Sequence, residues 1–188
     1  MGTCGAPAAG EQPDQKGNGM DSATLRALQA PLKQAYRDAP ESARITSRAE
    51  AELDVAAIAC RVHTPAGTVV AGLHPAAGGD GSAACSADML MEALAACTGV
   101  TLSAVATAMG IALRGGRIVA TCIWDARGTL GVDRAAPVGI TDITIEIALD
   151  SDAAPESLAR LIATAERYCV VYQTLRTPPR LTLVHPSG

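Results

Sequence analysis

The pattern of hydrophobic and polar positions changes several times along this chain. Residues 1–20 are rich in Gly, Pro, Ala and charge without any periodicity, which predicts a disordered tail. From Asp21 to Tyr36 leucines recur at helical spacing and predict an amphipathic helix with Leu25, Leu28 and Leu32 on one side. Pro31 predicts a break or kink there, because proline removes a helical hydrogen bond. We therefore expect a helical extension over residues 21–40 and one folded domain over residues 41–188.

A two-residue period then predicts three strands. Hydrophobic side chains alternate with polar ones at Ile45, Ala49, Ala51 and Leu53, as in a half-buried strand. A second strand is predicted over about residues 57–63, with Ile58, Cys60 and Val62 on one face. The turn at residues 65–67, Pro-Ala-Gly, leads into a third short strand over residues 68–71.

A long apolar helix follows a glycine-rich loop at residues 72–81. Ser86 is a suitable N-cap, and the helix is expected to end at Met109, because Gly110 can adopt a left-handed C-cap. The helix is apolar almost all round, so it must be covered on every side. A single two-layer domain covers only one side well. We therefore expect this helix to lie at the centre of a homodimer.

The C-terminal half predicts two more strands, a helix and a last strand. The inward faces of the two strands are Ile118, Ala120, Cys122 and Trp124, then Ile143, Ile145, Ile147 and Leu149. Pro155 is placed to open a helix, and residues 181–184 read as a short strand. The predicted order is a helix followed by β-β-β-α-β-β-α-β. Because strands and helices do not alternate regularly, the expected fold class is α+β.

Composition and charge narrow the function classes. The chain has 188 residues, no Phe and only 2% aromatic residues, so its core must use small aliphatic side chains, which also favours an oligomer. A net charge of -4 without a basic run argues against nucleic acid as a partner. The apolar run at residues 89–109 is too weakly apolar for a membrane span, and the N-terminus lacks an export signal. We therefore expect a cytoplasmic protein with no membrane partner.

Six cysteines become informative in a reducing compartment, where they are not a disulfide framework. There is no C-x-x-C motif and no His at ligand spacing from a Cys, so no metal site is expected. Cys60 and Cys122 face inward on predicted strands and read as core residues. Cys85 is expected to be a loop thiol, with a third redox role as the alternative, and Cys4 lies in the tail.

Cys97 and Cys169 remain as the candidates for a chemical role. Cys97 lies in the middle of the apolar helix, within Leu-Ala-Ala-Cys-Thr-Gly, and Cys169 lies near the end of the next helix, within Cys-Val-Val-Tyr-Gln-Thr-Leu. Taken singly, either cysteine has an ordinary interpretation as a small packed hydrophobic residue. Together, in this order and on these helices, they resemble the OsmC/Ohr family of peroxide-detoxifying proteins over about residues 42–185.

The resemblance implies a fold and an activity. The fold is an intertwined homodimer with its sites at the interface. The activity is that of a Cys-based peroxidase, an antioxidant oxidoreductase of the oxidative stress response that reduces organic hydroperoxides. Cys97 would be the peroxidatic thiol and Cys169 the resolving thiol, with a sulfenic acid and then a disulfide as intermediates. An external dithiol reductant would complete the cycle, and no cofactor is required.

Two positions depart from the family pattern. Ala87 stands where the peroxidases carry a Glu ten residues before the peroxidatic Cys, and Val170 replaces the Pro that usually follows the resolving Cys. The family also uses an Arg from the N-terminal strands to stabilise the thiolate, for which Arg48 is the first candidate and Arg44 the second. The alternative function is a non-catalytic OsmC-like dimer that binds an apolar ligand at its interface. The missing Glu favours that alternative, whereas the two matching thiols favour the peroxidase.

Overall fold

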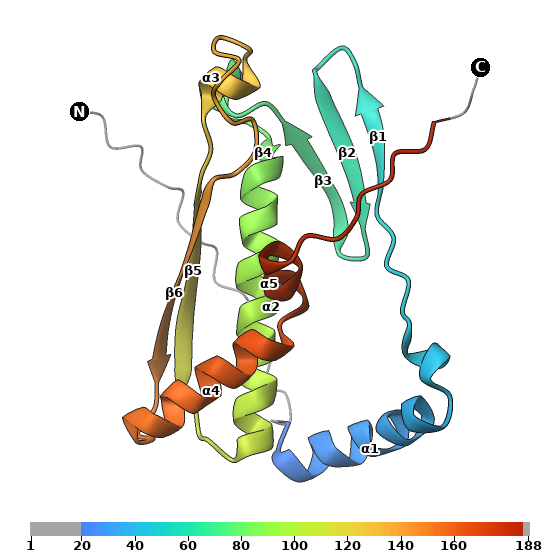
Figure 1. Ribbon diagram of the computed structural model, residues 1–188, viewed down its shortest axis with the longest axis vertical. Helices are drawn as coiled ribbons and strands as arrows, with labels where there is room; N and C mark the ends of the chain where they lie inside the picture. Colours follow the sequence, from blue (N-terminus) through green and yellow to red (C-terminus); the bar gives the residue numbers. More distant parts are fainter. Residues whose placement is uncertain (1–19, 186–188) are drawn as a thin grey trace.

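The long helix α2 (Ser86–Met109) forms the spine of the molecule (Figure 1). The computed structural model describes residues 20–185, so the predicted tail lies outside the described residues except for Met20. The antiparallel ribbon of β5 (Gly115–Ile123) and β6 (Asp142–Asp150) runs along one side of α2. Helix α4 (Pro155–Tyr168) crosses α2 and is followed by the short helix α5 (Val170–Arg176). The predicted α+β class is confirmed.

A second sheet stands beside the N-terminal part of α2 (Figure 1). Its strand order is β1 (Glu50–Asp54), β2 (Ala59–Thr64), β3 (Gly67–Gly72) and β4 (Ala84–Cys85). The first three strands are antiparallel, whereas β3 and β4 are parallel. Strand β4 is followed directly by α2, so this sheet is connected to the long helix.

Short helices fill the connections. They are η1 (Pro40–Ala43), η2 (Pro75–Ala77) and α3 (Ala126–Thr129). The N-terminal helix α1 (Ser22–Asp38) lies below the rest of the domain in Figure 1, and none of its side chains is buried. The side chain of Asp21 caps it by accepting a 2.7 Å hydrogen bond from the Thr24 N–H.

The core lies where α2, α4 and the β5–β6 ribbon meet. Leu102 and Ala106 of α2 pack with Leu161 and Ala165 of α4, and all four are almost completely buried. Ile118 of β5, Ile147 of β6 and Leu158 of α4 are among the half-buried residues around this cluster. The predicted inward faces of β5, β6 and α4 therefore meet as expected, because each has one apolar face that must be covered.

One side of α2 is not covered in the single chain. Its buried residues are Met91, Leu94, Thr98, Leu102 and Ala106, which follow each other at helical spacing. Val100, on the opposite side, is 71% exposed. The fold thus leaves the apolar surface that led us to expect a homodimer, and the homodimer itself stays a prediction.

The first predicted strand is shorter than expected. Residues 45–49 do not belong to β1, and Ile45 is 75% exposed. The hairpin turn after Asp54 pairs β2 only with residues 50–54, so the preceding residues have no neighbouring strand. Ile58, expected on a strand face, instead lies in that turn with a φ of 50°. A regular alternation is therefore not sufficient for a strand without a partner to pair with.

Three other local predictions are wrong. Cys85 rather than Ser86 is the N-cap of α2, and neither the cap nor the first turn forms a side-chain capping bond. Helix α1 continues past Pro31 to Asp38, so the predicted break is wrong, because one lost hydrogen bond does not outweigh the turns on either side. The alternative, a kink at Pro31, stays a prediction. Residues 181–184 form no strand: Leu181, for example, is 90% exposed, and none of these residues pairs with a strand among residues 20–185.

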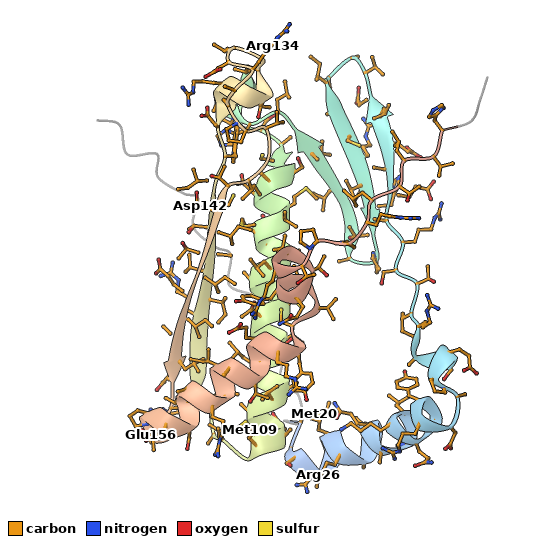
Figure 2. All side chains as sticks on the ribbon, in the orientation of Figure 1. Met20, Arg26, Met109, Arg134, Asp142 and Glu156 are labelled. Atoms are coloured by element: carbon orange, nitrogen blue, oxygen red, sulfur yellow. The ribbon has the colours of Figure 1, made fainter. Side chains whose placement is uncertain are left out.

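The expected C-terminus of α2 is confirmed: the helix ends at Met109, which is labelled at the lower end of α2 in Figure 2. Gly110 adopts a left-handed conformation with φ 69°, and its N–H donates to the carbonyls of Ala106 and Thr107. Pro155 is the first residue of α4, also as predicted. These two signals were reliable because each depends on backbone geometry that a single residue type supplies.

Candidate functional site

The fold brings Cys97 and Cys169 together. Cys97 lies half-buried in the middle of α2, and Cys169 lies between α4 and α5 with only 1% of its surface exposed. The Cys169 sulfur lies 3.8 Å from the hydroxyl oxygen of Thr98, the residue that follows Cys97, and the Cys169 side chain is one of the groups that, against burial, lower the pKa of the Cys97 thiol. Both cysteines are free thiols. The two candidate residues that sequence reasoning singled out thus form one site.

A break between two helices positions Cys169. Its backbone is extended, with φ -75° and ψ 109°, so that α4 ends at Tyr168 and α5 begins at Val170. The Cys169 N–H donates to the carbonyl of Ala165, and its own carbonyl accepts from the Gln173 N–H. The Gln173 side chain donates to the Glu166 carbonyl at 2.9 Å, which satisfies a group that the break would leave unpaired. A new helical turn therefore starts after Cys169 without the proline of the family motif.

The start of α5 favours the ionised form of Cys97. Burial by itself raises the pKa of the Cys97 thiol. The backbone N–H of Val171, the side chains of Cys169 and Thr101, and the N–H of Val170 act in the opposite direction, and the net pKa lies below the ordinary cysteine value. Hydrogen-bond donors near a sulfur stabilise its thiolate. The groups at the start of α5 therefore favour the ionised form of Cys97, although this cysteine lies in the middle of a helix.

Thr98 is a third polar group in the site. Its hydroxyl oxygen lies 3.8 Å from the Cys169 sulfur, and only 7% of its surface is exposed. This contact could not be predicted from the sequence, because a threonine within a helix usually bonds to the preceding turn of its own backbone. In this helix Thr98 instead faces the junction of α4 and α5.

An apolar groove of about 750 Å³ opens beside Cys169 and Thr98. Its floor is the isoleucine face of β6, with Ile143, Ile145 and Ile147, and one wall is α2 with Leu94 and Leu102. The other wall comes from α4 and α5. A groove of this size and lining suits a small organic molecule.

Glu166, Tyr172 and Arg176 form a polar cluster on the α4–α5 wall of the groove. Arg176 Nη1 lies 3.2 Å from Glu166 Oε1. The pKa of Tyr172 is raised by burial and by its hydrogen bond to the Glu166 carboxylate. The cluster spans the helix break, so the usual i, i+4 spacing does not reveal it.

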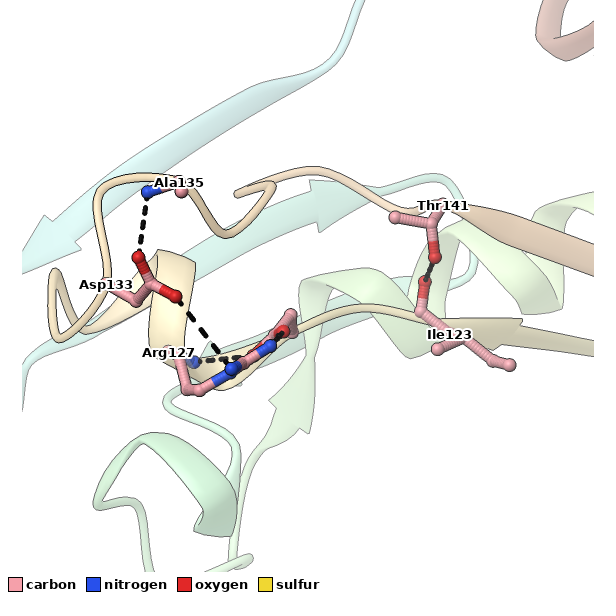
Figure 3. Close-up of polar contacts among 6 residues, drawn as sticks. Ile123, Arg127, Asp133, Ala135 and Thr141 are labelled. Atoms are coloured by element: carbon pink, nitrogen blue, oxygen red, sulfur yellow. Dashed lines mark hydrogen bonds and ion pairs between the residues drawn. The ribbon is translucent and has the colours of Figure 1, made fainter.

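The loop between β5 and β6 closes one end of the groove, where Ile140 and Thr141 line it. Figure 3 shows how polar contacts fix this loop. Asp133 accepts a 2.9 Å hydrogen bond from the Ala135 N–H, and the Thr141 hydroxyl donates to the Ile123 carbonyl at 3.3 Å. Arg127 pairs with Asp125 at 2.6 Å and approaches Asp133 at 3.8 Å.

Arg48 is not part of the site within one chain. Its guanidinium pairs with Glu50 at 2.8 Å, and its side chain is 79% exposed. Arg44 is also exposed. Among the described residues, the groups that shift the pKa of Cys97 include neither arginine. The structure therefore brings Cys97 and Cys169 together without bringing Arg48 to them.

The other described cysteines lie away from this site. Cys60, Cys85 and Cys122 are all half-buried. The pKa of the Cys122 thiol is raised by burial and, to a smaller extent, by the nearby Asp88 carboxylate and Cys85. A second hollow, between β5 and the first turns of α2, contains Cys122 together with His74 and Trp124, whose rings meet edge to face. Cys4 lies outside the described residues.

Possible metal ligands and the apolar character of α2 also bear on the class of protein. Within residues 20–185, no three His, Cys, Asp or Glu side chains are grouped so that they could hold a metal ion. Helix α2 is long and apolar enough to cross a membrane by length and composition. It is also the central helix of the domain, contacted by α4, α5 and β5, and the core helices of soluble proteins pass the same test. We therefore interpret α2 as a core helix.

These features define an α+β domain with two thiols held together at a helix junction. A model of the OsmC-like protein family matches residues 79–184, more than half of the chain. The chain belongs to this family, as its resemblance at Cys97 and Cys169 indicated. No curated protein matches it.

Solved structures show the same fold at low identity. The OsmC-like protein from Mycoplasma pneumoniae is 16% identical, with a TM-score of 0.61 over 71% of this chain and 89% of that one. The organic hydroperoxide resistance protein OsmC from Legionella pneumophila is 19% identical, with a TM-score of 0.53 over 72% and 92%. An organic hydroperoxide resistance protein from Elizabethkingia anophelis is 15% identical, with a TM-score of 0.51 over 72% of this chain and 91% of that one. At such identity these structures establish the fold.

Proposed function

We propose that this protein is a thiol-dependent peroxidase that reduces organic hydroperoxides with Cys97 and Cys169. The observation that carries the proposal is the packing of the α4–α5 junction against the middle of α2, where the Cys169 sulfur lies 3.8 Å from the hydroxyl of Thr98, the residue after Cys97. Burial raises the pKa of the Cys97 thiol, but the groups at this junction bring it below the ordinary cysteine value. Two relatives with the same fold are organic hydroperoxide resistance proteins by name. Their names, together with this pair of thiols, favour peroxide chemistry over other uses of the fold.

In the first step the Cys97 thiolate attacks the terminal oxygen of the hydroperoxide. The O–O bond breaks, an S–O bond forms, and Cys97 becomes a sulfenic acid. The alkoxide leaves with the electron pair of the O–O bond and takes a proton from water to become an alcohol. The N–H groups of Val170 and Val171 hold the sulfur in its ionised form before the attack.

In the second step the Cys169 thiol condenses with the sulfenic acid. A disulfide forms and water leaves, so that the two electrons used to reduce the peroxide have come from the two thiols. An external dithiol then attacks the disulfide and is itself oxidised, which restores both thiols. Neither step requires a metal or an organic cofactor.

The lining of the groove favours organic hydroperoxides over hydrogen peroxide. The isoleucines of β6 and the leucines of α2 give apolar surface to a hydrocarbon substituent. Hydrogen peroxide has no such substituent, so it would gain nothing from this surface. The same residues would exclude water from the Cys169 sulfur, which lines the groove.

A homodimer in the cytoplasm is part of this proposal. The exposed side of α2 around Val100 gives an apolar surface for a second copy. In that arrangement Arg48 of the second copy, rather than of the same chain, would approach Cys97. A reducing cytoplasm would keep both thiols ready for the reaction.

One equivalent of cumene hydroperoxide, added to the reduced protein, tests this function. Peptide mapping is expected to find a Cys97–Cys169 disulfide within seconds. C97S should abolish it, and C169S should stop the reaction at a sulfenic acid that dimedone captures. C122S is the matched control and should behave as the wild type. Unchanged thiols after long exposure would refute the proposal.

A second candidate is a binding protein without catalysis. The groove of about 750 Å³ favours it, and so does the pairing of Arg48 with Glu50 away from Cys97. In that case both cysteines would be packed side chains. Cys97 would then resist alkylation until the protein unfolds, which separates the two candidates.

A further inference from the structure

Thr98 differs from three other hydroxyl-bearing residues of the helices. Ser103, Thr107 and Thr164 each donate a hydrogen bond of between 2.7 and 3.0 Å to the carbonyl four residues before them. The Thr98 hydroxyl has a different partner within residues 20–185, the Cys169 sulfur at 3.8 Å, which lies 71 residues further along the chain. The hydroxyl is thus directed away from its own helix and toward the junction of α4 and α5.

Both partners of this contact are buried. Thr98 is 7% exposed and is the only polar residue among the almost completely buried side chains of residues 20–185, whereas Cys169 is 1% exposed. A buried hydroxyl is costly unless it is hydrogen-bonded. The backbone N–H and carbonyl of Cys169 already bond to Ala165 and Gln173. The sulfur is therefore the atom of Cys169 that Thr98 serves.

We infer that Thr98 is a positioning residue for the disulfide-forming step: its hydroxyl holds the Cys169 sulfur against α2, in place to attack the sulfenic acid on Cys97. A hydroxyl offers one donor and two acceptor sites, so Thr98 can accept a hydrogen bond from the Cys169 thiol and donate one to the thiolate. The S–S bond forms while the S–O bond of the sulfenic acid breaks. The hydroxide that leaves takes up the proton released by Cys169 and departs as water.

A second threonine of α2 is associated with the other thiol. Burial raises the pKa of the Cys97 thiol, and the Thr101 side chain is one of the groups that lower it. Thr98 and Thr101 lie three residues apart, so their side chains are neighbours on α2. Each thiol of the pair therefore has a hydroxyl of its own, and the loss of either hydroxyl should slow a different step.

This role of Thr98 rests on the proposed function for the order of the two steps. The contact between Thr98 and Cys169 is independent of that function, because a disulfide between Cys97 and Cys169 can also be formed with a small-molecule disulfide in place of a peroxide. One experiment therefore uses cumene hydroperoxide, and a second uses glutathione.

In the first experiment, one equivalent of cumene hydroperoxide is added to the reduced protein, and peroxide loss and disulfide formation are followed separately in quenched samples. T98V should consume the peroxide at the wild-type rate but form the Cys97–Cys169 disulfide about ten-fold more slowly, as the loss of one hydrogen bond to a charged atom predicts. T98S should restore the rate, because it keeps the hydroxyl. T101V should slow the loss of peroxide instead.

T107V is the matched control, because it removes from the same helix a hydroxyl that bonds to the Ser103 carbonyl. It should match the wild type in both steps. In the second experiment, equilibration with reduced and oxidised glutathione measures the disulfide without a peroxide. T98V removes a hydrogen bond that the reduced Cys169 makes, so we expect its ratio of disulfide to dithiol to rise several-fold, whereas T98S and T107V should stay near the wild type.

Disulfide formation in T98V at the wild-type rate, or an unchanged glutathione equilibrium, would overturn the role of Thr98. So would slow disulfide formation in T98S, since the shape of the side chain rather than the hydroxyl would then matter. A wild type that does not react with cumene hydroperoxide would refute the peroxidase instead. A shifted glutathione equilibrium in T98V would in that case still support the hydrogen bond to Cys169.

Discussion

Burial raises the pKa of the Cys97 thiol, and the backbone N–H of Val171, at the start of α5, is foremost among the groups that lower it. This interaction joins the first turn of α5 to the middle of α2, two elements far apart in the sequence. It provides donors to a thiol that the dipole of its own helix does not reach. The activation of Cys97 therefore depends on how α5 is placed rather than on a neighbouring side-chain cation in the same chain.

The first prediction concerns the ionisation of Cys97. Its lowered pKa means that the thiolate fraction rises and levels off at a lower pH than for an ordinary cysteine. Cys122 is the internal control, because burial and then Asp88 and Cys85 raise its pKa. Iodoacetamide labelling followed by mass spectrometry from pH 5 to 10 should place the midpoint for Cys97 below that for Cys122, and the reverse order would contradict the structure.

The second prediction concerns the departure at Val170. Because Val170 is the first residue of α5 and Cys169 is extended, V170P fits the backbone without rearrangement. We expect V170P to stabilise the fold by about 0.4–1 kcal/mol in urea unfolding. It should also raise the pKa of Cys97 slightly, since one of the donors that lower it is lost.

V171P is the comparison for this substitution. It would force Val170 out of the helical region and remove the stronger of the two backbone donors to Cys97. We expect V171P to destabilise the protein and to shift the Cys97 labelling midpoint further upward. Equal effects of the two prolines would argue against the described start of α5.

The third prediction concerns the core. Leu161 of α4 is completely buried where α4 packs against α2, so L161A should lower the free energy of unfolding by about 2–5 kcal/mol. L28A is the matched control, because Leu28 of α1 is 56% exposed and its loss should change the stability by less than about 0.5 kcal/mol. Similar losses for the two variants would mean that α1 is covered in solution.

The fourth prediction separates the two arginines near the N-terminal strands. If a second copy brings Arg48 to Cys97, as proposed, R48Q should lower kcat/KM for cumene hydroperoxide about ten-fold or more. R44Q should leave it unchanged. The decrease should be accompanied by an upward shift of the Cys97 midpoint, which a purely structural role of Arg48 would not produce. No change in R48Q would remove this residue from the mechanism.

Much of the fold was predictable because its signals are local. A single residue type indicates a backbone geometry at Gly110, where α2 ends, and at Pro155, where α4 begins. The alternating isoleucines of β6 indicate which face of that strand is buried. The short β1 was not predictable from alternation, since its length depends on where β2 begins to pair. The same holds for residues 181–184, which pair with no strand in the described chain.

The candidate site was predictable only in part. Cys97 and Cys169 were found through the family resemblance, because nothing in local periodicity brings two distant cysteines together. Thr98 and Arg176 were missed for the same physical reason: each acts through the packing of α4 and α5 on α2. Arg176 in particular reads in the sequence as an ordinary charge near a helix end.

The β6 strand carries a constraint that goes beyond its own stability. Its isoleucines form the floor of the groove because every second residue points the same way. An insertion of one residue before Ile143 would reverse this alternation and present Thr144 and Glu146 to the groove instead. The connecting loop can change its length without this effect, whereas the strand cannot. The register of a single strand thus decides whether the groove beside Cys169 has an apolar or a polar floor.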